Sequence, residues 1–225
     1  MGTPRTPKGR IAAISAQLAR DYPEALCELN HRNAFELLTA TILSAQTTDA
    51  RVNMVTPALF AKYPTAAALA AAEPGDLEDI IRSTGFYQSK ARNLVSMAHS
   101  VLDQFGGEVP TAREDLVTLA GVGRKTANVV RSVAFGLPGL PVDTHVGRLS
   151  RKWALTTHDD PVKVEAELCA LLPPADWGDF SLRTILHGRR VCDAKKPRCS
   201  ECHIEPLCPA SLLPRRPSPR VAETA

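Results

Sequence analysis

The sequence predicts an all-α fold, and three observations support this prediction. Apolar residues recur at spacings of three and four along most of the chain, as they do in amphipathic helices. No segment shows sustained alternation of apolar and polar residues, and no β-hairpin signal is present. Capping residues, glycines and prolines divide the chain into helical segments. With 225 residues, the chain is long enough for one domain or two small ones.

The first part of the chain contains three predicted helices. A basic tail leads into a helix from Ile11 to Ala19. Asn33 followed by Glu36 is typical of a helix N-terminus and begins the second helix. Asp49 is expected to cap the third, because its carboxylate can accept a bond from a free amide of the first turn. A short polar segment that contains Gln46 separates the last two.

The middle of the chain is predicted to hold two short helices and a long one. A helix rich in alanine spans Thr65 to Ala72, and another begins at Pro74. Gly85-Phe86-Tyr87 interrupts the pattern. A long helix then runs from Gln88 to Phe105, where Gly106-Gly107 stops it.

The segment from Asp115 to Phe135 predicts two helices joined by a tight hairpin. Gly121-Val122-Gly123 separates the two helical patterns, and its glycines provide the backbone freedom that a tight turn needs. Thr111 and Glu114 are expected to form a capping box before the hairpin. The turn leaves unpaired amides at the start of the second helix, where they and the helix dipole favour an anion.

Lys125 lies in the first turn of the second hairpin helix, beside the predicted anion site. An amine next to a bound phosphate is suited to attack a sugar in DNA. However, helix–hairpin–helix turns also occur in DNA-binding modules without enzymatic activity, and a lysine at a helix start is usually a solvated charge. This segment alone therefore favours binding of the DNA backbone over catalysis by lysine.

Three further helices are predicted in the C-terminal part. Asp143 is a good N-cap for a helix that reaches about Trp153. Asp160-Pro161 opens the next helix, and the last spans Asp176 to Arg190.

The net charge of +3 is modest, but the basic residues are clustered. Residues 121–152 include six basic residues and one acidic residue, and residues 183–220 include nine basic and three acidic residues. This segregation predicts one basic face that binds a phosphate backbone. No run of about 20 apolar residues occurs, so we expect no membrane segment.

Four of the six cysteines follow the pattern C-x6-C-x2-C-x5-C, namely Cys192, Cys199, Cys202 and Cys208. No secretory signal is visible, and in a reducing compartment four close thiols predict a metal site rather than disulfides. Zinc sites more often pair two C-x2-4-C halves across a longer loop, whereas a [4Fe–4S] cluster is compatible with this spacing. Ligand type alone leaves zinc and iron–sulfur nearly even. The first loop of the segment presents a basic finger made of Lys195, Lys196 and Arg198.

Taken together, these motifs resemble the endonuclease III family of helix–hairpin–helix DNA glycosylases. The resemblance extends from about Ala13 to Cys208. It rests on motifs in the family's order: Leu43-Ser44-Ala45-Gln46 with Thr48-Asp49, Gly85-Phe86-Tyr87-Gln88-Ser89-Lys90-Ala91, Leu119-Ala120-Gly121-Val122-Gly123-Arg124-Lys125-Thr126-Ala127-Asn128, Val142-Asp143-Thr144-His145-Val146, His187-Gly188-Arg189 and the cysteine segment.

The resemblance implies a two-lobed fold with a DNA cleft between the lobes. Residues 27–137 would form a six-helix barrel with the helix–hairpin–helix, and residues 138–213 an iron–sulfur cluster domain. Residues 1–26 would add a tail and a helix to the cluster domain, and residues 214–225 would be a disordered tail. The cysteine segment binds [4Fe–4S] in this family, so the resemblance favours iron–sulfur over zinc.

The resemblance also implies roles for single residues. Lys125 would be the nucleophile and Asp143 its acidic partner, while Gly121-Val122-Gly123 would grip a phosphate of the damaged strand. Gln46 and Phe86 match positions whose side chains fill the gap left by the extruded nucleotide. Family members often carry leucine in place of Phe86, and the bulkier side chain bears on which bases are accepted. The other expected DNA contacts are Arg124, His145, Lys195, Lys196 and Arg198.

The implied activity is that of a bifunctional DNA N-glycosylase and abasic-site lyase that removes oxidised pyrimidines in base excision repair. Lys125 would attack C1′ of a flipped nucleotide and form a Schiff base, and β-elimination would then cleave the strand. An ordinary lysine has a pKa near 10.4, so a neutral amine at pH 7 requires about 4 kcal/mol. Desolvation by bound DNA is expected to supply most of this, helped by Arg124. Asp143 is expected both to accept the lysine proton and to cap its helix.

Two other functions remain open: a monofunctional mismatch or adenine DNA glycosylase, and a non-catalytic DNA-binding iron–sulfur module. Adenine-mismatch relatives lack lysine at the position of Lys125. A non-catalytic module gives no reason for Lys125 and Asp143 together. We expect a monomer that acts on double-stranded DNA with a damaged base or an abasic site. We expect it in the bacterial cytoplasm, associated with the nucleoid, in preference to an organelle.

Overall fold

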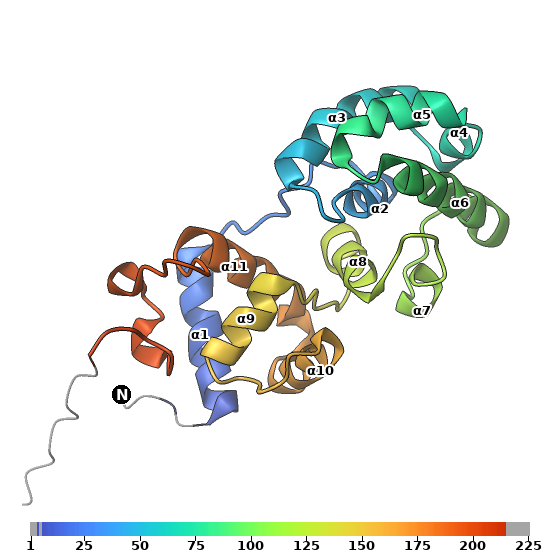
Figure 1. Cartoon of the computed structure of the whole chain (residues 1–225). Helices are drawn as coiled ribbons and strands as arrows, with labels where there is room; N and C mark the ends of the chain where they lie inside the picture. The colour runs from blue at the N-terminus through green and yellow to red at the C-terminus, as the bar shows by residue number, and fades with distance from the viewer. Residues whose placement is uncertain (1–3, 5, 215–225) are drawn as a thin grey trace, which may run out of the picture.

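Two separate hydrophobic cores organise the computed structural model, which describes residue 4 and residues 6–214 (Figure 1). The first core draws on one continuous stretch, residues 29–130. The second combines residues 11–22 with residues 140–204. The chain therefore forms two lobes, and its N-terminal helix packs with the C-terminal part. Over the described residues the secondary structure is helical, with no strand, which confirms the all-α prediction.

The first lobe is built around the long helix α6, whose Leu94 and Met97 are fully buried. Helices α4, α5 and α2 pack against it. A 3₁₀ turn at Arg82–Thr84 precedes α6, and a π-helical turn at Val130–Ala134 follows α8. The helices of this lobe are α2 (Ala34–Leu43), α3 (Asp49–Lys62), α4 (Ala66–Ala70), α5 (Pro74–Ile81), α6 (Tyr87–Phe105), α7 (Arg113–Leu116) and α8 (Arg124–Val129).

The second lobe packs α1 alongside α10 and α11, and α9 against α11 (Figure 1). Trp153 and Phe180 are its largest fully buried side chains. Three 3₁₀ turns lie at Pro174–Asp176, Cys199–Glu201 and Glu205–Leu207. The helices of this lobe are α1 (Pro7–Asp21), α9 (Thr144–Lys152), α10 (Pro161–Leu171) and α11 (Trp177–Arg190). None of the helices in the described part of the chain is both long enough and apolar enough to cross a bilayer.

Several predicted helix ends are confirmed. Asn33 accepts a 2.9 Å hydrogen bond from the amide of Glu36 at the start of α2. Asp160 caps α10 in the same way, through the amide of Lys163 at 2.9 Å. At the other end of α6, Gly106 adopts the left-handed conformation (φ +63°) that stops the helix.

Three predicted starts are wrong. The first helix begins at Pro7 rather than Ile11, because the hydroxyl of Thr6 caps it and part of the basic tail is helical. Thr48, not Asp49, caps α3, which leaves the Asp49 side chain available for other contacts. The capping box of Thr111 does not form, because the residue before α7 is Ala112, whose methyl side chain accepts no hydrogen bond. The predicted tail at 214–225 lies, beyond residue 214, outside the described residues.

The hairpin turn between α7 and α8 requires glycine at its first position. Gly121 has φ +78°, and a Cβ there would lie 3.1 Å from the side chain of Asn93 and 3.3 Å from that of Ile42. Val122 is buried in the first core and anchors the turn. Gly123 is the N-cap of α8 and contributes no side-chain cap, so the first amides of α8 are left for another partner. This turn therefore fixes the backbone position from which the Lys125 side chain extends.

Candidate active site between the lobes

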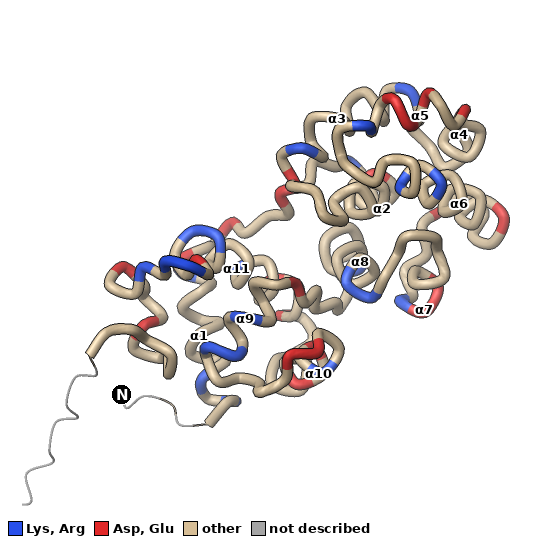
Figure 2. The backbone as a smooth tube through the Cα atoms, in the orientation of Figure 1, with Lys and Arg blue, Asp and Glu red and all other residues tan. Residues whose placement is uncertain are grey.

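Lys125 faces a pocket formed by both lobes. It is the second residue of α8 and is exposed. The first lobe contributes Ser44, Asp49 and Lys125 to the pocket wall, and the second contributes Asp143 and Arg189. Figure 2 shows basic residues at the start of α8, on the side of the first lobe nearest to α9. The structure therefore brings the predicted nucleophile and its predicted acidic partner into one pocket.

Asp143 holds the start of α9 at the pocket wall. Its Oδ1 accepts a 2.8 Å hydrogen bond from the amide of Val146, which confirms the predicted N-cap. The carboxylate is partly buried, and the cap uses only one of its two oxygens. A second oxygen remains for chemistry in the pocket.

Asp49 is a third charged residue of the pocket, and sequence reasoning assigned it only a capping role. Its Oδ2 accepts a 2.9 Å bond from Arg189, which also pairs with Glu28. Burial raises the pKa of Asp49; the positive charge of Lys125 opposes this shift, and the negative charge of Asp143 adds to it. The charges of Lys125 and Asp143 therefore both act on Asp49 in the pocket. In the sequence, the one indication of this role was that Asp49 directly follows Thr48, the residue that caps α3.

Gln46 and Phe86 lie at the tips of two neighbouring loops. Both have left-handed backbones, with φ of +54° and +48°. The Phe86 side chain is 68% exposed, although it is large and apolar. The loops are joined directly, because the Thr47 hydroxyl donates to the carbonyl of Thr84. Strained, exposed conformations of this kind gather at functional sites.

Arg124 is paired with a carboxylate of the other lobe. Its Nε and Nη2 donate to the two oxygens of Glu165 in α10, at 2.7 and 3.0 Å. Glu165 is buried and also lies 3.7 Å from Arg113. The charge of Arg124 is thus compensated in the free protein, which weakens the expectation that it assists Lys125 electrostatically.

His145 packs between α9 and α11. A Cβ added to Gly188 of α11 would lie 2.6 Å from His145 Nδ1, so the imidazole occupies the space that glycine leaves. Its Nδ1 is buried without a hydrogen-bond partner in the described part of the chain. His145 is partly buried overall, because the contact between α9 and α11 covers part of its side chain.

The basic finger is shaped by Asp193. Its Oδ1 accepts bonds from the amides of Lys195 and Lys196, at 2.8 and 3.1 Å, and both lysine residues are exposed. Arg198 is also exposed, but it pairs with Glu201 at 3.2 Å. The two lysines are therefore the more available cations of this loop.

The four cysteines of the C-terminal segment line one pocket, beside Trp153 and His187. A positive charge lies close to the sulfur atoms, because Arg148 Nη1 is 3.8 Å from Cys192 Sγ. Burial raises the pKa of the Cys202 thiol to about 11, so a bound cation must offset the cost of ionising it. The described residues contain no group of three or more His, Cys, Asp or Glu residues placed to hold a single metal ion. The donor set, the enclosure and the neighbouring cation fit a four-thiolate group.

His187 lines this pocket as a neutral ring. It is 1% exposed, and burial lowers its pKa to about 4. Its Nδ1 lies 3.1 Å from the Tyr22 hydroxyl and its Nε2 lies 3.6 Å from Cys202 Sγ. A neutral ring that accepts from Tyr22 carries its proton on Nε2 and directs it at the sulfur.

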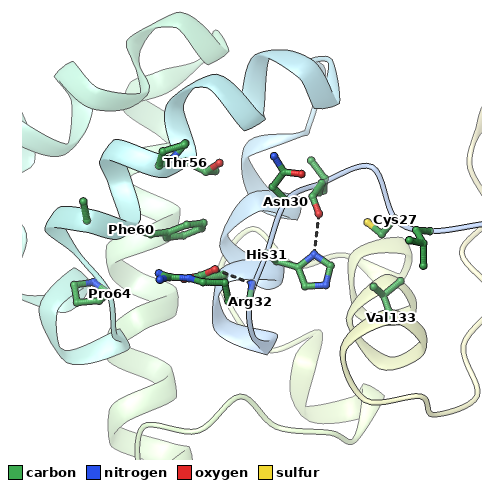
Figure 3. Close-up of a pocket in the computed structure, with 13 residues that line it drawn as sticks. Cys27, Asn30, His31, Arg32, Thr56, Phe60, Pro64 and Val133 are labelled. Atoms are coloured by element: carbon green, nitrogen blue, oxygen red, sulfur yellow. Dashed lines mark hydrogen bonds and ion pairs between the residues drawn. The ribbon is translucent and has the colours of Figure 1, made fainter.

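A larger pocket beside α3 contains none of the predicted site residues (Figure 3). Its wall includes Phe60 and Val133, and the ring of His31 is held there by a 2.8 Å bond to the carbonyl of Leu29. It shares Cys27 with the Lys125 pocket, so the segment around Cys27 separates the two.

The fold and the hairpin site define a base excision DNA repair protein of the helix–hairpin–helix class. The family model described as "HhH-GPD superfamily base excision DNA repair protein" matches residues 39–174. Curated relatives include endonuclease III of Synechocystis sp., 50% identical over 91% of this chain and 94% of the relative. Endonuclease III of Escherichia coli is 40% identical over 89% and 95%.

Solved structures agree with this assignment. A non-covalent endonuclease III–DNA complex has a TM-score of 0.86 and 45% identity, with 91% of this chain and 96% of that chain covered. A thermostable thymine-DNA glycosylase, at 22% identity and a TM-score of 0.81, shares the fold. The chain belongs to the endonuclease III family of DNA glycosylases and abasic-site lyases, which are enzymes of base excision repair.

Proposed function

We propose that this chain is a bifunctional DNA N-glycosylase and abasic-site lyase that removes oxidised pyrimidines from duplex DNA, with Lys125 as nucleophile. The observation that carries the proposal is the pocket in which Lys125 of the hairpin helix meets Asp143 of the second lobe. The similarity to an endonuclease III bound to DNA supports duplex DNA as the partner. The basic residues at the start of α8 support the same partner.

Each step of the reaction is assigned to a group of the site. The damaged nucleotide flips out of the helix, and Gln46 and Phe86 fill the gap that it leaves. Asp143 accepts a proton from Lys125, and the amine Nζ then attacks C1′. The bond from C1′ to the base breaks, and the base leaves with the electron pair and takes up a proton. The sugar ring opens to give a Schiff base with Lys125.

Strand cleavage follows from the Schiff base. Loss of a proton from C2′ expels the 3′ phosphate by β-elimination, and water then releases Lys125 from the product. The hairpin Gly121-Val122-Gly123 would hold a phosphate of the damaged strand with the free amides at the start of α8. Lys195 and Lys196 would contact the backbone further along.

We also propose that Cys192, Cys199, Cys202 and Cys208 hold a [4Fe–4S] cluster. The shared pocket and the cysteine spacing support this cofactor. When bound, the cluster would tie together the segment that carries the basic finger and present Lys195 and Lys196 to DNA. The proposed domains are 1–26 with 138–213, and 27–137. We place the protein in the cytoplasm, where its DNA substrate is available.

The test is covalent trapping. Borohydride reduces a Schiff base, so wild-type protein incubated with an abasic-site duplex should give a stable protein–DNA adduct. Lys125→Ala should give none, while Lys62→Ala, at the exposed end of α3, should trap like wild type. An adduct formed by Lys125→Ala would refute the assignment of the nucleophile. On a second duplex that carries thymine glycol, base release without an adduct or strand cleavage would instead indicate a monofunctional glycosylase.

A further inference from the structure

Lys90 is a buried lysine whose ammonium group is fully occupied by two surface loops. It lies in the first turn of α6 and is 5% exposed. Its Nζ donates three hydrogen bonds, each 2.8 Å long, to the Leu43 carbonyl, the Thr47 hydroxyl and the Thr84 carbonyl. An ammonium has three donors, so the two loops use all of them.

The acceptors on Thr47 and Thr84 belong to the loops whose tips are Gln46 and Phe86, and the Leu43 carbonyl lies at the end of α2, where the Gln46 loop begins. Thr47 is the neighbour of Gln46, and Thr84 lies two residues before Phe86. Thr47 also donates to the Thr84 carbonyl, so one hydroxyl connects both loops and the ammonium. Lys90 therefore lies beneath the junction of the two loops.

Both tips need such support. Gln46 and Phe86 have left-handed backbones, which residues with a Cβ adopt only where the surroundings enforce them. Among the described residues, only Ala154 shares this conformation without being glycine. The backbone of Phe86 is held from the same helix turn, because its carbonyl accepts from the amide of Lys90 at 3.0 Å.

The chemistry of Lys90 also indicates a purpose beyond packing. Its three partners are neutral oxygens, and burial of a cation without a carboxylate is unfavourable compared with burial of an apolar side chain. Methionine has a similar shape and would fill the same space without that cost. The buried ammonium is explained if the cross-link between the loops is what matters.

We propose that Lys90 is a positioning residue for nucleotide extrusion: it fastens the Gln46 loop to the Phe86 loop so that both tips enter the DNA helix as one unit. The inference rests on the proposed function, in which these two side chains fill the gap in the duplex. Lys90 itself would not touch the substrate.

The experiment measures extrusion separately from binding. The probe is a duplex with a tetrahydrofuran abasic analogue opposite 2-aminopurine, whose fluorescence rises when the base is unstacked. Lys90→Met should lower the fluorescence rise and slow single-turnover release of thymine glycol by about tenfold, the factor expected for loss of a hydrogen bond from a charged donor. Affinity for undamaged duplex should change less than about twofold, because Lys90 is buried and the exposed basic residues are unchanged. Lys62→Met removes an exposed lysine of the same lobe and should behave like wild type.

Thr47→Val gives a second route to the same result, since it removes the shared hydroxyl and keeps Lys90. It should show the same defect to a smaller extent. If Lys90→Met does not fold, the result for Thr47→Val decides whether the inference holds. In a protein that already carries Gln46→Ala and Phe86→Ala, Lys90→Met should add less than about twofold to the defect in extrusion.

Wild-type fluorescence and base release in both Lys90→Met and Thr47→Val would overturn the inference. So would a tenfold defect of Lys90→Met that persists in the background without the tips, since it would show a general structural role. A failure of the proposed wedge function looks different, because Gln46→Ala with Phe86→Ala would then extrude the nucleotide normally.

Discussion

Asp143 caps α9 and is proposed to accept the proton of Lys125, and substitution can separate these two roles. Asp143→Asn keeps a side-chain oxygen for the amide of Val146, now 2.8 Å from Oδ1, and removes the negative charge. Asp143→Ala removes both. Loss of an N-cap costs about 1 kcal/mol, and for a chain of this size that corresponds to about 2–4 °C in Tm. Thermal unfolding should therefore show a loss for Asp143→Ala and little change for Asp143→Asn.

Activity should follow charge rather than capping. A positioned proton acceptor contributes about 10²- to 10⁴-fold to a rate, so both variants should release thymine glycol more slowly by that order under single-turnover conditions. Asp160 is a matched control, because it caps α10 through the amide of Lys163 at 2.9 Å and is absent from the pocket wall. Asp160→Ala should lose the same stability and keep its activity.

Two results would refute this reasoning. Wild-type base release by Asp143→Asn would show that the charge does no chemistry. Equal losses of activity in Asp143→Ala and Asp160→Ala would show that helix stability, and not the carboxylate, limits the rate.

Three further predictions concern the second lobe. Gly188→Ala should lower the free energy of unfolding in urea by about 1–3 kcal/mol through overpacking, because its Cβ would meet His145 Nδ1 at 2.6 Å, and His145→Ala should relieve part of the loss, since the Cβ of residue 145, at 3.0 Å, remains. The Cys169 thiol should react with iodoacetamide at pH 9 about 50-fold more slowly in the folded protein than in urea, because burial raises its pKa from 9.0 to about 11; equal rates would contradict this. Cys202→Ser should lower iron and sulfide content and expose residues 192–208 to protease, whereas Cys169→Ser should change neither; full iron content in Cys202→Ser would exclude it as a ligand.

Helix starts could be predicted well where the signal is local. The caps at Asn33, Asp143 and Asp160 each join a side chain to an amide three residues away, so the necessary contact is written in a few neighbouring residues. The same logic failed at Asp49, because Thr48 and Asp49 are both competent caps and the chain uses the first. Local rules could not choose between them.

The predicted site residues that meet in the pocket, Lys125 and Asp143, came from the likeness of whole motifs to a family. Contacts between distant segments had no such signal. Lys90 is the single lysine of α6, and nothing nearby in sequence indicates that Leu43 and Thr47 would surround it. Arg124 was likewise expected to assist Lys125 and to contact DNA, and no local signal showed that Glu165 of the other lobe pairs with it. Such pairs depend on how helices pack, which the spacing of apolar residues does not specify.

The order of synthesis and the order of folding differ in this molecule. The first core draws on residues 29–130 alone, so it can assemble as soon as that stretch has left the ribosome. Helix α1 is made before any of it, yet the residues that bury Ile11, Ile14 and Leu18 follow residue 139. Helix α1 can therefore bury its apolar face only after the last third of the chain has been synthesised. Until then, this face is accessible to any partner of the nascent protein.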